Sequence, residues 1–71
     1  MEVLVFRTTV EDLKAVEYLG PRLDSLVGRG QWNFALDDRD KILRIVSGAI
    51  RPEMAIDLLA ECGFDCCELT D

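Results

Sequence analysis

The clearest pattern in the chain is an alternation of apolar and polar side chains between Trp32 and Val46. Large apolar residues occupy every second position on both sides of a short polar segment, residues 37–40. They are Trp32, Phe34 and Leu36 before that segment, and Leu43 and Ile45 after it. A period of two places such side chains on one face of a strand. The pattern therefore predicts a β-hairpin, and a lone hairpin needs other elements to cover its apolar face.

A strand is predicted from Glu2 to Arg7, before the hairpin. Four consecutive apolar residues in it are typical of a strand in the centre of a sheet. A helix is predicted to start at Thr8 and Thr9, because each threonine is followed three positions later by an acidic residue.

The first helix is defined by apolar residues at helical spacing, and it is predicted to end at Gly28 and Gly30. These apolar residues are Val16, Leu19, Leu23 and Leu26. Gly20-Pro21 lies in the middle of the stripe, and a proline inside a helix removes one hydrogen bond. The helix is therefore expected to be kinked, or divided into two short helices with Pro21 at the start of the second.

A second helix is predicted to open at Pro52 and to end at Gly63, with a last strand over residues 64–69. Its buried face is expected to hold Ala55, Leu58, Leu59 and Cys62. The order strand, helix, strand, strand, helix, strand predicts an α+β fold, a ferredoxin-like split β-α-β sandwich. Residues 1–71 would form one domain, with a four-stranded antiparallel sheet and two helices on one face.

Composition limits the function further. The chain has 8 basic and 14 acidic residues, a formal net charge of −6, and no histidine. Clustered lysine and arginine for phosphate contacts are missing, which argues against nucleic acid as a partner. No apolar run reaches the roughly 20 residues of a membrane span, and the N-terminus does not resemble a signal peptide. We therefore expect a cytoplasmic protein that does not insert into membranes and whose cysteines are thiols.

Several positions together resemble the heavy-metal-associated domain family, which includes small copper chaperones and the N-terminal domains of copper-pumping ATPases. They are Leu19, Leu23 and Leu26, then Gly28, Trp32, Phe34, Leu36 and Asp37, and finally Gly63-Phe64-Asp65. The resemblance covers nearly the whole chain and implies the same fold. Because most of these are core and cap positions, they specify fold more than chemistry.

The metal-binding loop of that family, Gly-Met-x-Cys-x-x-Cys, has no equivalent in this chain. Counting back from Gly28 through the first helix, Val10 stands where the family has methionine. Asp12 and Ala15 stand where it has the two cysteines. Cu(I) selects soft thiolate ligands, which neither residue provides. The chain thus resembles a family member that lacks the metal site.

The soft ligands that the chain does have are Cys62, Cys66 and Cys67. One hypothesis is a displaced thiolate site for Cu(I) or Zn beside the start of the first helix. The alternative is structural: Cys62 is a small apolar residue on the core face of the second helix, and Cys66 and Cys67 point to opposite faces of a strand. We favour the structural interpretation.

Three other groups of residues have simpler explanations than a site. Asp37, Asp38 and Asp40 lack the spacing and the glycine of a calcium loop, which indicates a solvated hairpin tip. The pair Glu11–Asp12 suits the positive end of a helix. Trp32 is in phase with apolar neighbours, which favours a core position over a recognition role.

No nucleophile–base pair, phosphate loop or cofactor motif is apparent, so we predict a protein that is not an enzyme and has no resident cofactor. Helices cover only one face of the sheet, so either Leu4 and Phe6, or Val3 and Val5, would remain on the open face. We predict that Leu4 and Phe6 form the interface. The predicted function is binding a protein partner or a second copy through that face. The alternative is a soft-metal carrier that uses the three cysteines.

Overall fold

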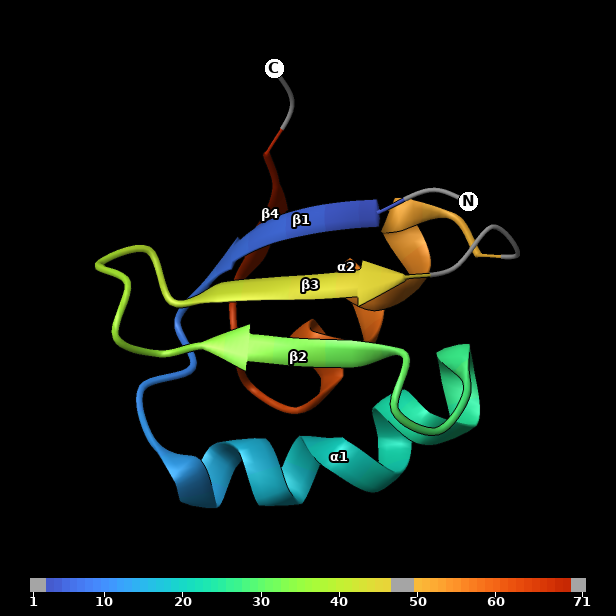
Figure 1. Ribbon diagram of the computed structural model, residues 1–71, viewed down its shortest axis with the longest axis horizontal. Helices are drawn as coiled ribbons and strands as arrows, with labels where there is room; N and C mark the ends of the chain where they lie inside the picture. Colours follow the sequence, from blue (N-terminus) through green and yellow to red (C-terminus); the bar gives the residue numbers. More distant parts are fainter. Residues whose placement is uncertain (1–2, 47–49, 70–71) are drawn as a thin grey trace.

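Four strands form one antiparallel sheet in the computed structural model of the chain, which describes residues 3–46 and 50–69. The strands are β1 (Val3–Thr8), β2 (Trp32–Ala35), β3 (Ile42–Val46) and β4 (Cys66–Glu68). They lie side by side in the order β2-β3-β1-β4 (Figure 1). The predicted ferredoxin-like α+β sandwich is confirmed, as is the central place of β1. Glu2, which the predicted first strand included, lies outside the described residues.

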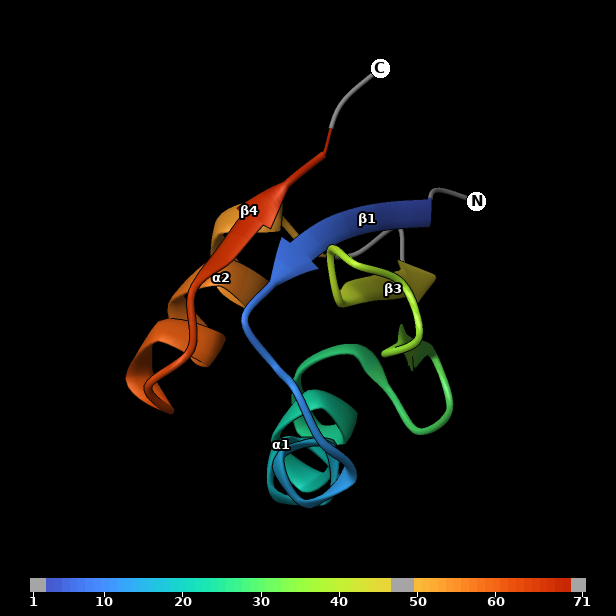
Figure 2. The same cartoon turned by 90° about the vertical axis from the view of Figure 1, so that its left-hand side faces the viewer.

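Two helices, α1 (Leu13–Val27) and α2 (Pro52–Glu61), lie on the same side of this sheet (Figure 2). The core forms between the helices and the sheet, and it joins the hairpin to α2 as expected. Its largest fully buried side chains are Phe6, Val10, Leu19, Leu23, Leu43, Ile45 and Leu59. Cross-strand pairs align the inward side chains, because Phe6 lies opposite Leu43 and Leu4 lies opposite Ile45.

Helix α1 begins at Leu13, later than the predicted start at Thr8 and Thr9. Asp12 is its N-cap, and the Oδ1 atom of Asp12 accepts a hydrogen bond of 2.9 Å from the backbone N–H of Ala15. Thr8 is the last residue of β1, and the Oγ1 atom of Thr9 accepts a hydrogen bond from the N–H of Asp65. The prediction of a helix start at Thr8 and Thr9 is wrong because neither threonine caps the helix. The Thr8 hydroxyl donates to the carbonyl of Lys41, and the Thr9 hydroxyl accepts from the N–H of Asp65.

Helix α1 continues through Pro21 as a single helix and is not divided in two. Gly20 is buried beneath the indole ring of Trp32, where an added Cβ would lie 3.4 Å from the ring atom Cζ2. One turn further on, Asp24 accepts a hydrogen bond of 2.8 Å from Nε1 of Trp32. Trp32 is therefore a half-buried contact between β2 and α1, which agrees with its predicted structural role.

The hairpin forms where predicted, but its first strand ends at Ala35 and residues 36–41 form the loop. Leu36 was expected on the strand, and it packs against the core from the loop instead. In this loop Lys41 has a positive φ of 50°, a conformation that asparagine and aspartate adopt more readily than lysine. The Asp38 carboxylate accepts a hydrogen bond from the N–H of Asp40, which is a local turn interaction of a solvated loop.

Helix α2 opens with Pro52 as predicted, and it ends at the predicted glycine, Gly63, in a Schellman motif. The N–H of Phe64 donates to the carbonyl of Leu59 (2.9 Å), and the N–H of Gly63 donates to that of Ala60 (3.1 Å). Gly63 has φ 89, in the region that disfavours a Cβ. This ending turns the chain back so that Phe64 packs against the core and β4 can pair with β1.

We expect Gly63→Val to lower the free energy of unfolding by about 1–2 kcal/mol, because an L-residue in the left-handed region is strained. Gly63→Asn should cost less, since asparagine tolerates that region. Urea denaturation of the two variants beside the wild type measures both effects. Equal stability of all three proteins would contradict this account of the α2 ending.

Candidate functional site

The loop between β1 and α1, where the resembled family binds metal, is occupied here by structural residues. Val10 is fully buried in the core, and Ala15 packs against it. Asp12 uses its carboxylate to cap the helix. The buried Thr8 hydroxyl accepts a hydrogen bond from the N–H of Val10 and donates one to the carbonyl of Lys41. All three motif positions therefore already serve the fold.

The three cysteines do not point to one place. Cys62 follows the last turn of α2, Cys66 is half-buried against the core, and Cys67 is exposed. Cys66 and Cys67 alternate on β4, so their side chains lie on opposite faces of the sheet. Within residues 3–46 and 50–69, no group of three or more acidic, cysteine or histidine side chains is placed to hold a metal ion.

The environment of Cys66 also disfavours a metal ligand. Burial, and to a lesser extent the neighbouring Cys67, raise the pKa of the Cys66 thiol from 9.0 to about 12. Because the thiolate is the form that binds metal, coordination by Cys66 would first have to overcome this cost.

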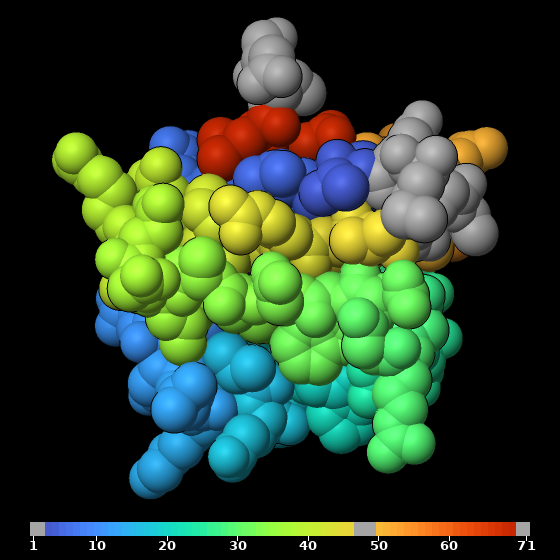
Figure 3. Space-filling model, in the orientation of Figure 1, coloured from blue at the N-terminus to red at the C-terminus, as the bar shows by residue number. Residues whose placement is uncertain are grey.

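A different surface offers a site: the side of the sheet that faces away from both helices, which we call the open sheet face. Outward positions follow from the alternation of each strand and from the cross-strand registers. They are Val3, Val5 and Arg7 on β1, Ile42, Arg44 and Val46 on β3, Asn33 and Ala35 on β2, and Cys67 on β4. Leu69 extends this set, because its N–H donates to the carbonyl of Val5 (2.8 Å). Figure 3 looks onto this side of the sheet.

One part of the open sheet face is an aliphatic patch. Val3 lies opposite Val46 across the β1–β3 pair, and Leu69 is bonded to the backbone of Val5. The side chains of Val3 and Leu69 are 55% and 40% exposed, and those of Val5 and Val46 are partly exposed. Neighbouring aliphatic groups that remain in contact with water are typical of a protein interface.

The charges on the open sheet face have the opposite sign to the chain as a whole. Arg44 lies between Val5 and Asn33 in a cross-strand row, and Arg7 lies opposite Cys67 in the next row. Both arginines are exposed. No outward position of the four strands carries an aspartate or glutamate, although the chain has a net charge of −6. The face is thus locally cationic on an acidic protein.

The choice of Leu4 and Phe6 as interface residues is wrong. Leu4 is 9% exposed and Phe6 is completely buried, and both belong to the core cluster. The register of β1 turns Val3 and Val5 outward instead, which was the other alternative. The sequence interpretation also missed Arg7 and Arg44. The position of Arg44 between Leu43 and Ile45 was the available signal, because it marks the face opposite to the core.

Protein-family models, curated proteins and solved structures were compared with the chain, and none of them matched it. Neither described helix is long and apolar enough to cross a membrane.

We expect the wild-type protein to bind Cu(I) weakly at the β1–α1 loop, and the double change Asp12→Cys with Ala15→Cys to create a tight site. Two thiolates spaced by three positions at a helix start are soft ligands, although losing the Asp12 cap should cost about 1 kcal/mol of stability. Competition with a Cu(I) chelator measures both affinities. A folded double variant without added affinity would show that this loop does not correspond to the family's loop. Tight wild-type binding that is lost in Cys62→Ser with Cys66→Ser would favour the carrier hypothesis.

We also expect the folded protein to lose stability between about pH 9 and pH 12, in part through Cys66. Its pKa is raised in the folded state, so both states keep the proton below about pH 9, whereas at higher pH the unfolded state loses it first. Urea denaturation at about pH 8 and about pH 11 should show a smaller pH effect in Cys66→Ala than in the wild type. The same pH effect in both proteins would contradict the half-buried position of this thiol.

Proposed function

We propose that this chain is a non-catalytic domain, similar to heavy-metal-associated domains but without their metal loop, that binds an acidic protein partner on its open sheet face. The protein acts in the cytoplasm, where its three free thiols stay reduced. The observation that carries the proposal is the pairing of an aliphatic patch with two exposed arginines, Arg7 and Arg44, on a face whose outward strand positions carry no carboxylate.

The two kinds of side chain on this face have different roles in binding. The patch of Val3, Val5, Val46 and Leu69 supplies apolar area whose removal from water stabilises a complex. Arg44, at the centre of the face, supplies a fork of N–H donors that matches carboxylate geometry. The rest of this net-negative chain would repel an acidic partner. The charge pattern therefore favours docking through the open sheet face.

A partner of different sequence is better supported than a face-to-face dimer. A two-fold symmetric interface brings the same patch of both subunits together. Two copies joined through the open sheet face would place Arg7 and Arg44 of one copy near the arginines of the other. Like charges brought together in an interface oppose association.

The soft-metal carrier has less support in the geometry. Asp12 and Ala15 are a cap and a packing residue, and the thiol of Cys66 is held in its protonated form by burial. No described observation favours Cu(I) or Zn at the three cysteines over their structural roles.

Photocrosslinking from the open sheet face tests the proposal. A photoreactive amino acid replaces Val5, and the labelled protein is irradiated in extract of its own cells. We expect one crosslinked acidic protein, which is then identified, purified and titrated with the unlabelled chain. Arg44→Glu should weaken this binding about tenfold or more, because a charge-assisted pair becomes a repulsion. The matched control Lys14→Glu makes the same charge change on exposed α1, and should leave binding unchanged beyond a small general effect.

Two results would overturn the proposal. Equal loss of binding in Arg44→Glu and Lys14→Glu would show that net charge, rather than the open sheet face, governs association. A crosslinked product with twice the mass of the chain would identify a second copy as the occupant. The second result contradicts the choice of partner and keeps the choice of face.

A further inference from the structure

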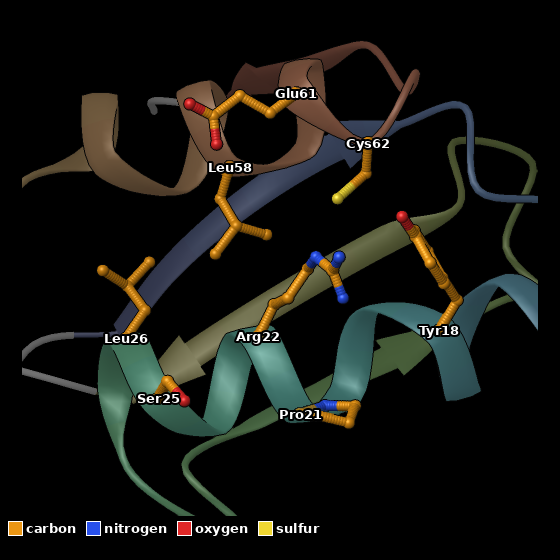
Figure 4. Close-up of a pocket in the computed structure, with 8 residues that line it drawn as sticks. All are labelled: Tyr18, Pro21, Arg22, Ser25, Leu26, Leu58, Glu61 and Cys62. Atoms are coloured by element: carbon orange, nitrogen blue, oxygen red, sulfur yellow. The ribbon is translucent and has the colours of Figure 1, made fainter.

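A groove lies between the two helices, on the other side of the sheet from the open sheet face. It has a volume of about 640 Å³. Its walls are Tyr18, Pro21, Arg22, Ser25 and Leu26 from α1, and Leu58, Glu61 and Cys62 from the end of α2 (Figure 4). Sites for small ligands typically have volumes of about 300–1,000 Å³, so the groove is large enough for a small organic molecule.

The groove remains open because the two helices pack against different strands, α1 against β2 and α2 against β4. Helix α1 is held at β2 by Gly20 and Trp32, whereas the end of α2 turns directly into β4. Ser25, beside Leu26 at one end of the groove, and Cys62, near Tyr18 at the other, are too small to reach across it (Figure 4). Leu26 and Leu58 are only half-buried, so they leave an apolar surface at one end.

Arg22 places a cation inside this groove. Its Cζ atom lies 4.5 Å from the centroid of the Tyr18 ring, one helical turn earlier. This cation–π contact holds the flat guanidinium against the ring and leaves its N–H edge directed toward the space between α1 and α2 (Figure 4). A guanidinium held in this way loses less rotamer freedom when it binds a carboxylate.

We propose that the groove binds a small carboxylate that carries an apolar or aromatic body. The carboxylate accepts hydrogen bonds from Arg22, and the body lies toward Leu26 and Leu58. The anionic end belongs near Tyr18, because Figure 4 shows the carboxylate of Glu61 at the other end, beside Leu58. This site is separate from the proposed protein interface and does not depend on it.

A titration followed by amide NMR tests this inference, with 4-phenylbutyrate as the probe. We expect shift changes at Tyr18, Arg22, Leu26 and Leu58, with saturation. The matched probe 4-phenylbutylamine, which has the same body and the opposite charge, should bind about tenfold more weakly or not at all.

Variants identify the group that recognises the probe. Arg22→Gln, an exposed change that should fold normally, is expected to weaken binding of the carboxylate about tenfold or more. Arg22→Lys should be intermediate, because it keeps the charge and loses the planar fork. Arg44→Gln removes an exposed arginine on the far side of the sheet and should leave binding unchanged. Glu61→Gln should bind at least as tightly as the wild type.

Three outcomes would overturn the inference. They are shift changes that map outside the groove, equal affinity for the carboxylate and the amine, and unchanged affinity in Arg22→Gln. None of these outcomes alters the proposal for the open sheet face, which Arg44→Glu tests separately.

Discussion

The rest of the structure depends on the register of β1, the strand that pairs with both β3 and β4. With helices on one side of the sheet only, its alternating side chains have two different environments. Leu4 and Phe6 enter the core, whereas Val5 and Arg7 face solvent. A slip of one residue would exchange these sets and place the arginine in the core, which is costly. The core and the open sheet face are therefore specified by the same pairing.

The residues of the β1–α1 loop have structural roles. Its backbone is tied to the start of β4 by two hydrogen bonds, because Thr9 donates its N–H to the carbonyl of Asp65 and its Oγ1 accepts from the Asp65 N–H. Val10 fills the core and Asp12 caps α1. These contacts stabilise a helix start that in the resembled family presents metal ligands.

Local chemistry made much of the fold predictable. The alternation from Trp32 onward identified the hairpin, and Pro52 and Gly63 identified both ends of α2, because each feature acts within a few residues. The outward face of β1 was not predictable, since Val3–Phe6 is apolar throughout and its register is set by pairing with β3 and β4. The prediction of the start of α1 was wrong for a similar reason, because Thr9 binds Asp65, which is distant in the sequence. The arginines of the open sheet face and the interhelical groove likewise depend on how whole elements pack.

Attenuation of methyl NMR signals by a paramagnetic agent in the solvent tests the role of the open sheet face most directly. A soluble paramagnetic agent is added to the isotope-labelled chain, alone and in complex with the partner that crosslinks from position Val5. In the free chain, the methyl groups of Val3, Val5 and Leu69 should be attenuated, as should those of Leu13, which is 72% exposed on α1. In the complex, the first three should become protected while Leu13 stays attenuated. Protection of Leu13 with continued attenuation of Val5 and Leu69 would contradict docking on the open sheet face.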